Sequence, residues 1–389
     1  MNLLKNKTIA IIGGGPGGLT LARLLQKKGA DVKVYERDFN REVRAQGATL
    51  DLHHESALKA LEEAGLMDAF KANYRPDADR LRIVDENAEI FFDEHHENSK
   101  GDFGDEWFRP EIDRGPLRNL LLDSLAADTV VWDSHILSLE EIDNQWKIIF
   151  QNGNTATADI VIGADGANSK IRPFVTPIKP FYSGVTVLMG NIYDSEKNTP
   201  RINALLQGGK IMGFGNSQTL SVSAKGDGSL DFYAGWNIDP DWIKNADIDF
   251  KNDSQVLEWF KKEYSNWDSI WLELFEAEKN YLIPNPLYCM PLDQSWEAQS
   301  NITLIGDAAH LMPPYAGEGV NMAMLDALQL SESLTSENFT DLKSAIAHYE
   351  KQMFERFAEV GKETLDNTDW MHSPNGLKKI IEMFNWESN

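Results

Sequence analysis

The sequence predicts an α/β protein: a parallel-sheet domain, an inserted and mostly antiparallel β-sheet domain, and a C-terminal bridging helix. Three observations lead to this fold class. The chain opens with a strand–glycine–helix–strand pattern over residues 8–35. Two further strands that run into glycine follow much later, at residues 159–163 and 301–306. Between about residues 178 and 288, alternating segments are separated by Gly, Asp, Asn and Ser, as in antiparallel sheets.

The opening pattern is a βαβ unit. Thr8–Ile12 is a β-branched run that ends in glycines, and Leu19–Lys28 has helical spacing and is closed by Gly29. Val32–Tyr35 follows as a second strand, and Ser56–Ala64 reads as another helix, which stops at a glycine. A helix that joins two strands in this way implies a parallel sheet.

The later elements alternate between strand and helix patterns. Strands are expected at residues 81–84, 89–92, 129–132, 145–150, 155–158, 205–213, 219–223 and 230–236, and helices at 114–126, 344–361 and 377–384. The order implies a discontinuous nucleotide-binding domain (1–75, 106–177 and 285–330), a substrate domain (76–105 and 178–284) and a C-terminal helical segment (331–389). Apolar residues at helical spacing in 345–364 predict a helix that braces both domains.

A glycine-rich loop joins the first strand to the first helix. Gly13 allows a tight turn, Gly15 lets the backbone approach a pyrophosphate, and Gly18 lets helix and strand pack closely. Glu36 ends the second strand, 18 residues after Gly18, where a carboxylate can accept hydrogen bonds from a ribose diol. The pattern predicts a Rossmann-like dinucleotide site, and it leaves FAD and NAD both open.

Two further segments have an aspartate next to glycine at the end of a strand. Asp165-Gly166 follows the strand at 159–163, and Gly306-Asp307 follows the strand at 301–306. Residues 317–321 then open a helix that runs to Leu328. An aspartate here can bind ribityl hydroxyls, and the helix N-terminus can stabilise a reduced flavin. These two segments favour FAD over NAD.

With its glycine-rich, Asp-Gly and Gly-Asp segments in this order, the chain resembles the group A flavoprotein monooxygenases. It is most similar to the tetracycline-inactivating FAD monooxygenases (tetracycline destructases) at Tyr35-Glu36-Arg37, at residues 49–53 and 110–118, and through Gly306–Pro314. The resemblance implies that a nicotinamide nucleotide, NADPH or NADH, reduces FAD. The reduced flavin then adds O₂ as a hydroperoxide and passes one oxygen atom to the substrate.

The same resemblance implies which residues contact the cofactors. The expected set is Gly13, Gly15, Gly18, Glu36, Arg37, Arg44, Asp51, Arg114, Asp307, Gly319 and Asn321. Arg44 matches a position used for the nicotinamide nucleotide. For each charged residue an alternative stays open, since Arg114 could be a helix-surface charge and Asp51 a turn residue. His310, after the Gly-Asp segment, is expected to be structural because a lone histidine does not argue catalysis.

The resemblance weakens in the inserted sheet, where substrate would bind. The approximately aligned positions are Met189, Lys210 and Asp231, in place of the glutamine, arginine and histidine of the tetracycline-inactivating enzymes. The segment with Pro314, Tyr315 and Gly317 is expected to form a pocket wall. A hydrophobic or aromatic small molecule is therefore the expected substrate, with a tetracycline-type antibiotic, and hence antibiotic resistance, as one candidate.

Composition narrows the partners. The 389 residues carry 37 basic and 61 acidic side chains, a net charge of −24, which opposes binding to nucleic acid or anionic membranes. The single cysteine, Cys289, has no metal-ligand companions and indicates a reducing compartment. No apolar run has the length of a membrane helix, and no signal peptide is expected. We expect a cytoplasmic monomer without a metal.

The leading hypothesis is an FAD-dependent, NAD(P)H-consuming monooxygenase. A flavin-dependent reductase or halogenase on the same scaffold, and a flavin- or ligand-binding protein without turnover, are the alternatives. The absence of a Trp-x-Trp-x-Ile-Pro segment counts against a halogenase. An NAD dehydrogenase remains if only the first glycine motif is functional, and it would be colourless.

Overall fold

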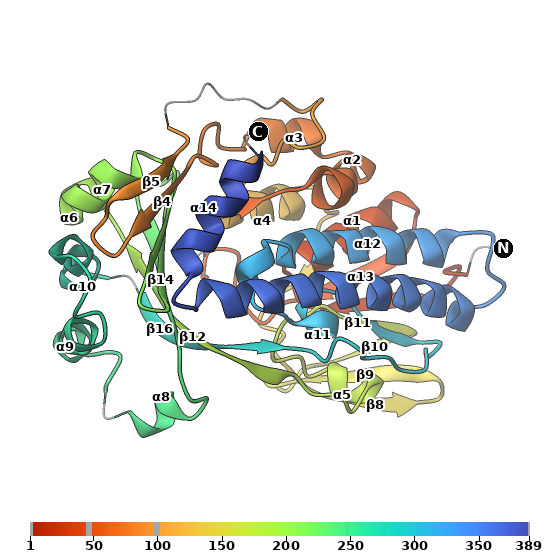
Figure 1. Ribbon diagram of the computed structural model, residues 1–389. Helices are drawn as coiled ribbons and strands as arrows, with labels where there is room; N and C mark the ends of the chain where they lie inside the picture. The colour runs from red at the N-terminus through yellow and green to blue at the C-terminus, as the bar shows by residue number, and fades with distance from the viewer. Residues whose placement is uncertain (1–2, 44–48, 96–101, 247, 280, 388–389) are drawn as a thin grey trace.

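The computed structural model describes residues 3–43, 49–95, 102–246, 248–279 and 281–387, with side chains as far as Phe384. It confirms the α/β fold class. A five-stranded parallel sheet and a seven-stranded sheet lie side by side, and the long helix α13 (Leu342–Met371) runs along the domain of the first and ends at the second (Figure 1).

The parallel sheet has the strand order β17-β11-β1-β2-β7. Its strands are β1 (Thr8–Ile12), β2 (Asp31–Tyr35), β7 (Val130–Val131), β11 (Ile160–Gly163) and β17 (Ile302–Leu304). Strand β11 and the edge strand β17 are buried throughout, as expected for a parallel sheet covered on both faces. Strands far apart in sequence thus end at one edge, where the three predicted motifs meet.

The helices α1 (Pro16–Lys27), α4 (Arg114–Asp123) and α12 (Gly319–Thr335) belong to this domain. A Cβ on Gly17 would lie 2.9 Å from the carbonyl oxygen of Ala323, so the start of α1 packs directly on α12. The predicted helix at 56–64 is divided in the structure. It begins as a π-helix, η1 (His54–Leu58), and continues as α2 (Lys59–Ala64).

The seven-stranded sheet has the order β16-β12-β15-β14-β13-β4-β5. Its strands are β4 (Leu81–Asp85), β5 (Ile90–Asp93), β12 (Phe181–Ile192), β13 (Lys210–Gly215), β14 (Gln218–Ala224), β15 (Leu230–Asn237) and β16 (Tyr281–Cys289). All neighbours pair antiparallel except β13 and β4, so the expected mostly antiparallel sheet is confirmed.

One strand prediction in this sheet is wrong. Residues 205–213 do not form one strand, because α7 (Pro200–Leu206) occupies the first part and β13 begins only at Lys210. Pro200 at the first helical position fits a helix start, and Ile202 and Leu206 turn toward the core. A left-handed Gln207 and the glycines at 208 and 209 then separate helix from strand.

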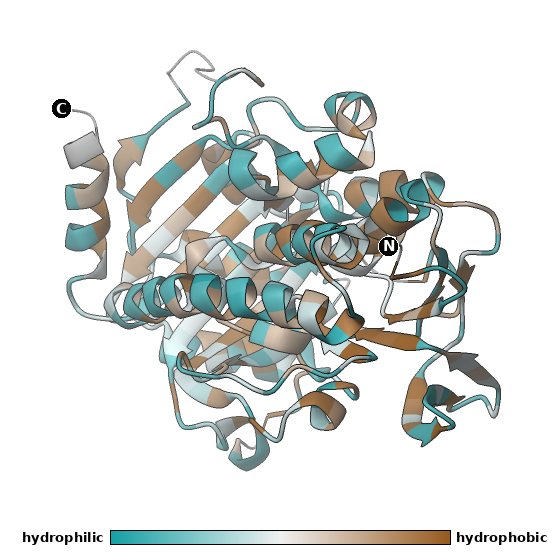
Figure 2. Ribbon diagram, turned by 90° about the vertical axis from the view of Figure 1, so that its right-hand side faces the viewer, coloured by the Kyte–Doolittle hydropathy of each residue, from teal (hydrophilic) through white to brown (hydrophobic). Residues whose placement is uncertain are grey.

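The two faces of this sheet have different neighbours. Leu188, Leu220, Val222 and Phe232 point into a core that contains Trp259 and Phe260 of α9 (Asp253–Glu263). In Figure 1 the helices α6, α7, α9 and α10 lie on this side, whereas α1, α12 and α13 lie on the other. Figure 2 shows the strands banded in brown and paler colours, as alternating burial requires.

The C-terminal helices complete the fold. The predicted bracing helix at 345–364 is confirmed as α13 (Leu342–Met371), which is longer than expected and packs on α12, and α14 (Gly376–Glu387) folds back against β13 and β4. Asp341 caps α13 by accepting a hydrogen bond from the backbone N–H of Ser344.

The remaining elements are short. They are β3 (Thr49–Asp51), β6 (Glu111–Asp113), β8 (Ile136–Ile142), β9 (Gln145–Phe150), β10 (Thr155–Ala158), α3 (Met67–Lys71), α5 (Arg172–Val175), α6 (Ser195–Asn198), α8 (Trp242–Asn245), η2 (Ser269–Leu272), α10 (Glu273–Glu276), α11 (Asp307–His310) and η3 (Pro314–Ala316). Within the described ranges, no helix is long and apolar enough to cross a membrane.

Candidate functional site

The glycine loop between β1 and α1 has one open position and two closed ones. A Cβ on Gly13, whose φ is +115°, would lie 2.2 Å from the carbonyl oxygen of Ala164, and one on Gly18 would lie 2.2 Å from that of Gly13. Gly15, the N-cap of α1, would meet nothing within 4 Å. The loop is therefore tight at its base and open where the first N–H groups of a helix can receive an anion.

Glu36 is buried at the end of β2 and is held by the backbone. Its Oε2 accepts a hydrogen bond from Gly14 N at 2.6 Å, and its Oε1 accepts one from Asp38 N at 2.9 Å. The predicted ribose-binding acid thus also fixes the glycine loop. Arg37 beside it is exposed, and Arg44 lies outside the described residues.

Arg172 joins the Asp-Gly segment to the Gly-Asp segment. Its guanidinium donates to the carbonyl oxygens of Asp307 and Ala308, both at 2.7 Å. Asp165 accepts hydrogen bonds from Ser169 Oγ at 2.5 Å and from the backbone N–H of Lys170 at 2.6 Å. The two motifs therefore form one rigid corner beside the glycine loop.

Gly306 and Asp307 stand where β17 ends. Gly306 has φ +58° and ψ −145°, a conformation that essentially only glycine adopts. The Asp307 side chain keeps exposed surface. Desolvation by the surrounding protein raises the pKa of its carboxyl, and the charges of His310, Arg114 and Arg172 offset only part of this rise. A carboxylate in such surroundings can accept hydrogen bonds from a polyhydroxyl ligand.

His310 is buried and pairs with Asp326, so it is not the lone histidine that the sequence suggested, and its structural role stays a prediction. Nε2 of His310 lies 2.6 Å from Oδ2 of Asp326, which also accepts the N–H of Gly306 at 2.8 Å. Oδ1 of the same carboxylate binds Arg356 on α13 at 2.5 Å. All of Asp326 is buried, so this ion-paired group anchors the Gly-Asp turn to α12 and α13.

The first turn of α12 is tied to β3. Asn321 is fully buried; its Nδ2 donates to Asp51 O at 3.0 Å, and its Oδ1 accepts the N–H of His53 at 2.9 Å. A Cβ on Gly317 would lie 3.5 Å from Oδ2 of Asp51, and one on Gly319 would meet nothing within 4 Å. The Asn321 side chain is thus engaged internally, while the start of the helix is open.

His53 lies between two carboxylates at this place. Nε2 lies 3.1 Å from Oδ2 of Asp51, and Nδ1 lies 2.9 Å from Oε1 of Glu318, the N-cap of α12. Burial lowers the pKa of His53, but its hydrogen bonds and charge interactions with Asp51 and Glu318 outweigh this and raise the pKa to about 9. The imidazole is therefore protonated at neutral pH.

A row of half-buried side chains lies on the face of the seven-stranded sheet that is opposite the core under α9. Met189 is in register with Tyr233, Tyr233 with Ser221, and Ser221 with Met212, across β12, β15, β14 and β13. Met189 and Tyr315, which precedes α12, both pack against the apolar cluster of Val185, Val187 and Leu287. We call the four residues in register the sheet row. It faces the parallel-sheet domain rather than the core under α9.

The two charged substrate candidates belong to the next row. Lys210 is ion-paired with the buried Glu111 of β6. Asp231 has no exposed surface, and it accepts hydrogen bonds from Asn191 Nδ2 at 2.8 Å and Tyr281 Oη at 3.1 Å. Any effect of Asp231 on a ligand would therefore pass through its partners.

Tyr315 is within hydrogen-bond distance of His372, the C-cap residue of α13. Nε2 of the buried His372 lies 3.2 Å from Tyr315 Oη and 3.1 Å from Thr219 Oγ1, while Nδ1 lies 2.8 Å from Thr368 O. Burial lowers the pKa of His372 to about 4, so the neutral ring donates from Nδ1 and accepts at Nε2. Gly235 leaves the necessary space, since a Cβ there would lie 2.9 Å from Nε2.

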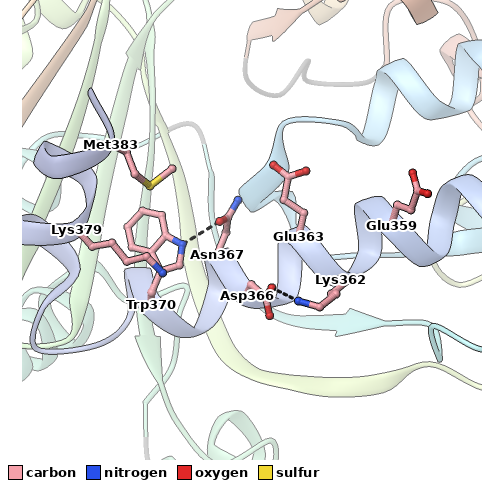
Figure 3. Close-up of a pocket in the computed structure, with 8 residues that line it drawn as sticks. All are labelled: Glu359, Lys362, Glu363, Asp366, Asn367, Trp370, Lys379 and Met383. Atoms are coloured by element: carbon pink, nitrogen blue, oxygen red, sulfur yellow. Dashed lines mark hydrogen bonds and ion pairs between the residues drawn. The ribbon is translucent and has the colours of Figure 1, made fainter. Parts of the chain in front are cut away.

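A separate groove of about 360 Å³ lies between α13 and α14 (Figure 3). Trp370 forms part of it and donates from Nε1 to Asn367 Oδ1 at 2.8 Å, and Met383 closes the α14 side. None of the predicted site residues lines this groove. In the part of the chain that the structure describes, no cluster of His, Cys, Asp and Glu could hold a metal ion.

The structure thus brings most of the predicted cofactor residues to one edge of the parallel sheet, and Met189, Lys210 and Tyr315 to the facing side. Sequence reasoning did not find His53, Asp326 or His372 as parts of this arrangement. Only His53 had a local signal, since it lies two residues after the expected contact Asp51. The others come from segments distant in sequence.

Comparisons with known proteins agree with this geometry. A family model described as "FAD binding domain" matches residues 6–187 and 294–358. The monooxygenase penA of Penicillium thymicola is 26% identical over 96% of this chain and 97% of its own length. Two solved structures share the fold at 20% identity. HpxO of Klebsiella pneumoniae, complexed with FAD and uric acid, covers 100% of this chain and 94% of its own with a TM-score of 0.76. The tetracycline destructase Tet(55) covers 93% and 89% with a TM-score of 0.73.

Proposed function

Because the chain belongs to the FAD-binding domain family and is an FAD-dependent monooxygenase, we propose that it uses NAD(P)H and O₂ to insert one oxygen atom into a flat, hydrophobic or aromatic small molecule. The observation that carries the substrate class is the sheet row, a half-buried strip of Met189, Tyr233, Ser221 and Met212. Thioether and aromatic side chains suit a flat apolar ligand, and the hydroxyl groups among them can orient it.

The chain offers fitting residues for FAD. The open Gly15 and the first turn of α1 would receive the pyrophosphate, and Glu36 the adenosine ribose. Asp307 and the start of α12 would hold the ribityl chain and the ring. When bound, FAD supplies the oxygen-transfer chemistry; the protein orients the substrate and excludes water around it.

The wall opposite the sheet row would be built by the segment with Pro314, Tyr315 and Gly317. Tyr315 packs against the same apolar cluster as Met189 and is held by His372. A site between them would have an apolar centre, with Lys210 and Glu111 at one end. A substrate with an aromatic body and an ionisable or hydroxyl group at one end fits this distribution. Tet(55) shares only the fold, so tetracyclines are one class to test among several.

The experiment measures NADH and NADPH consumption by the FAD-loaded protein with phenols, hydroxylated N-heterocycles and tetracyclines, together with product masses. We expect at least one compound to stimulate consumption and to gain one oxygen atom. Met189→Trp should abolish that stimulation without loss of FAD, because the indole fills the sheet row. Met383→Trp, the same change at an exposed residue of α14, should have no effect.

Two results would count against the proposal. Bound FAD without ligand-stimulated consumption of NADH or NADPH across the panel would favour a binding protein. Equal activity of Met189→Trp and Met383→Trp would remove the sheet row as the substrate floor. Reduction of a substrate without oxygen gain would instead favour a flavin-dependent reductase.

A further inference from the structure

Five ionisable side chains cluster around the start of α12. Asp51 comes from β3, Glu111 from β6, Lys210 from β13, Glu318 from the N-cap of α12, and His53 lies among them with only 2% of its surface exposed. Lys210 pairs with Glu111. Burial raises the pKa of Asp51, but the hydrogen bond with His53 and the charge of Lys210 outweigh this and lower it. The carboxylates outnumber the cations here.

His53 is held in place by its backbone as well as by its ring. Its N–H donates to Asn321 Oδ1 at 2.9 Å, and the π-helix η1 (His54–Leu58) begins at the next residue. Ser56 within η1 also donates to Asn321 Oδ1, at 3.3 Å. Single-turn π-helices are frequent at functional sites. The two imidazole nitrogens thus lie within ion-pair distance of Asp51 and Glu318, and Nδ1 makes no aligned hydrogen bond within the described residues.

A helix N-terminus stabilises an anion, and a carboxylate on its N-cap residue opposes that effect for any further anion. Glu318 occupies the N-cap position of α12, and Asp51 lies against the preceding Gly317. With both carboxylates uncompensated, this helix end would repel negative charge. Lys210 acts on Asp51 and is paired with Glu111, whereas His53 is the cation within ion-pair distance of both Asp51 and Glu318.

We propose that His53 is a positioning residue for bound FAD: its imidazolium compensates Asp51 and Glu318, so that the start of α12 stabilises the charge that FAD gains on reduction. Hydride transfer from a nicotinamide nucleotide adds two electrons and one proton to FAD, which leaves one additional negative charge on the ring system. This inference depends on bound FAD and not on the identity of the substrate.

The test is the two-electron midpoint potential of bound FAD in four proteins at neutral pH: the unmodified chain, His53→Gln, Glu318→Gln and the double variant. Glutamine keeps a hydrogen-bonding amide at position 53 and removes the charge. We expect His53→Gln to weaken binding of reduced relative to oxidised FAD about tenfold, equal to a fall of about 30 mV in the potential. Glu318→Gln should raise the potential, and the double variant should return toward the unmodified value.

A merely structural role gives a different pattern. Loss of packing would lower FAD affinity and thermal stability in both single variants, and the losses would add in the double variant. Potentials that do not move, or that move in the same direction in both single variants, would overturn the proposal. His348→Gln, at an exposed position on α13, is the matched control and should leave the potential unchanged.

A second measurement covers the case in which His53→Gln does not fold or bind FAD. In the unmodified protein the potential should fall more steeply with pH as His53 loses its proton near pH 9. The other ionisable groups around the imidazole are Asp51, Glu318, Glu111 and Lys210. In Glu318→Gln this steeper region should move to lower pH. A potential whose pH dependence shows no such region in either protein would refute the proposal.

Discussion

Gly15→Ala tests whether the glycine loop binds the pyrophosphate of FAD, at the position where an added side chain meets no protein atom. Gly15 has φ −80° and ψ 176°, which alanine adopts without strain, and its added Cβ would meet no protein atom within 4 Å. The protein without FAD should therefore keep its stability or gain about 0.4–1 kcal/mol. The methyl group would stand where the pyrophosphate approaches the backbone.

Overpacking of this kind costs about 1–3 kcal/mol, so the Kd for FAD should rise by about 5- to 150-fold. Flavin fluorescence titration of the protein stripped of FAD measures the Kd, and urea unfolding of the same sample measures stability. The combination of weak binding and intact stability is the expected result.

Gly18→Ala is the matched comparison. Its Cβ would lie 2.2 Å from the carbonyl oxygen of Gly13 and 3.2 Å from Cβ of Ala164, so the backbone must shift. This variant should lose stability before FAD is added. If Gly15→Ala bound FAD as tightly as the unmodified chain, the assignment of this loop to the pyrophosphate would be refuted.

Three further outcomes follow from buried groups. Because the folded-state pKa of His372 is near 4 and the unfolded value near 6.5, its stabilising contribution is present above pH 6.5 and declines as pH falls toward 4; urea unfolding should show this loss, and His372→Gln should reduce it. Asp326→Asn should destabilise the chain by about 3–5 kcal/mol, because it breaks the buried pairs with His310 and Arg356, whereas the exposed Asp366→Asn should change little. Cys289 is buried and its thiol pKa is raised to about 12, so a thiol reagent at pH 8 should label it only after unfolding. Stability that is level between pH 6.5 and 4, an Asp326→Asn loss no larger than that of Asp366→Asn, or rapid labelling of the native thiol would each contradict the corresponding burial.

The parallel-sheet domain could be predicted from sequence because its signals are local. Thr8–Ile12, the glycine loop and Glu36 are close together in the chain, and their spacing alone defines a βαβ unit. The long helix α13 was also clear, since its apolar positions repeat over many turns. The strand predicted at 205–213 failed because the apolar residues of α7 suit helix and strand alike, and the proline at 200 was the only local sign of a helix start.

The sequence predicted which residues contact the cofactor, but not the ion pairs and hydrogen bonds that hold those residues in place. No spacing rule joins Asp326 to Arg356, or His372 to Thr219, because these partners are 30 and 153 residues apart and meet only after folding. Asp231 is a residue whose predicted role the folded structure does not support. Its alignment suggested contact with a ligand, whereas the folded sheet buries it under Tyr281 and Asn191.

The measurement closest to the central claim is a single turnover series under ¹⁸O₂ with any compound that stimulates NAD(P)H oxidation. A monooxygenase should give a product that carries one ¹⁸O atom, with the second atom of each O₂ recovered as water. This expectation would be contradicted by products that take their oxygen from H₂¹⁸O, or by hydrogen peroxide as the sole product of O₂ with every compound that stimulates oxidation.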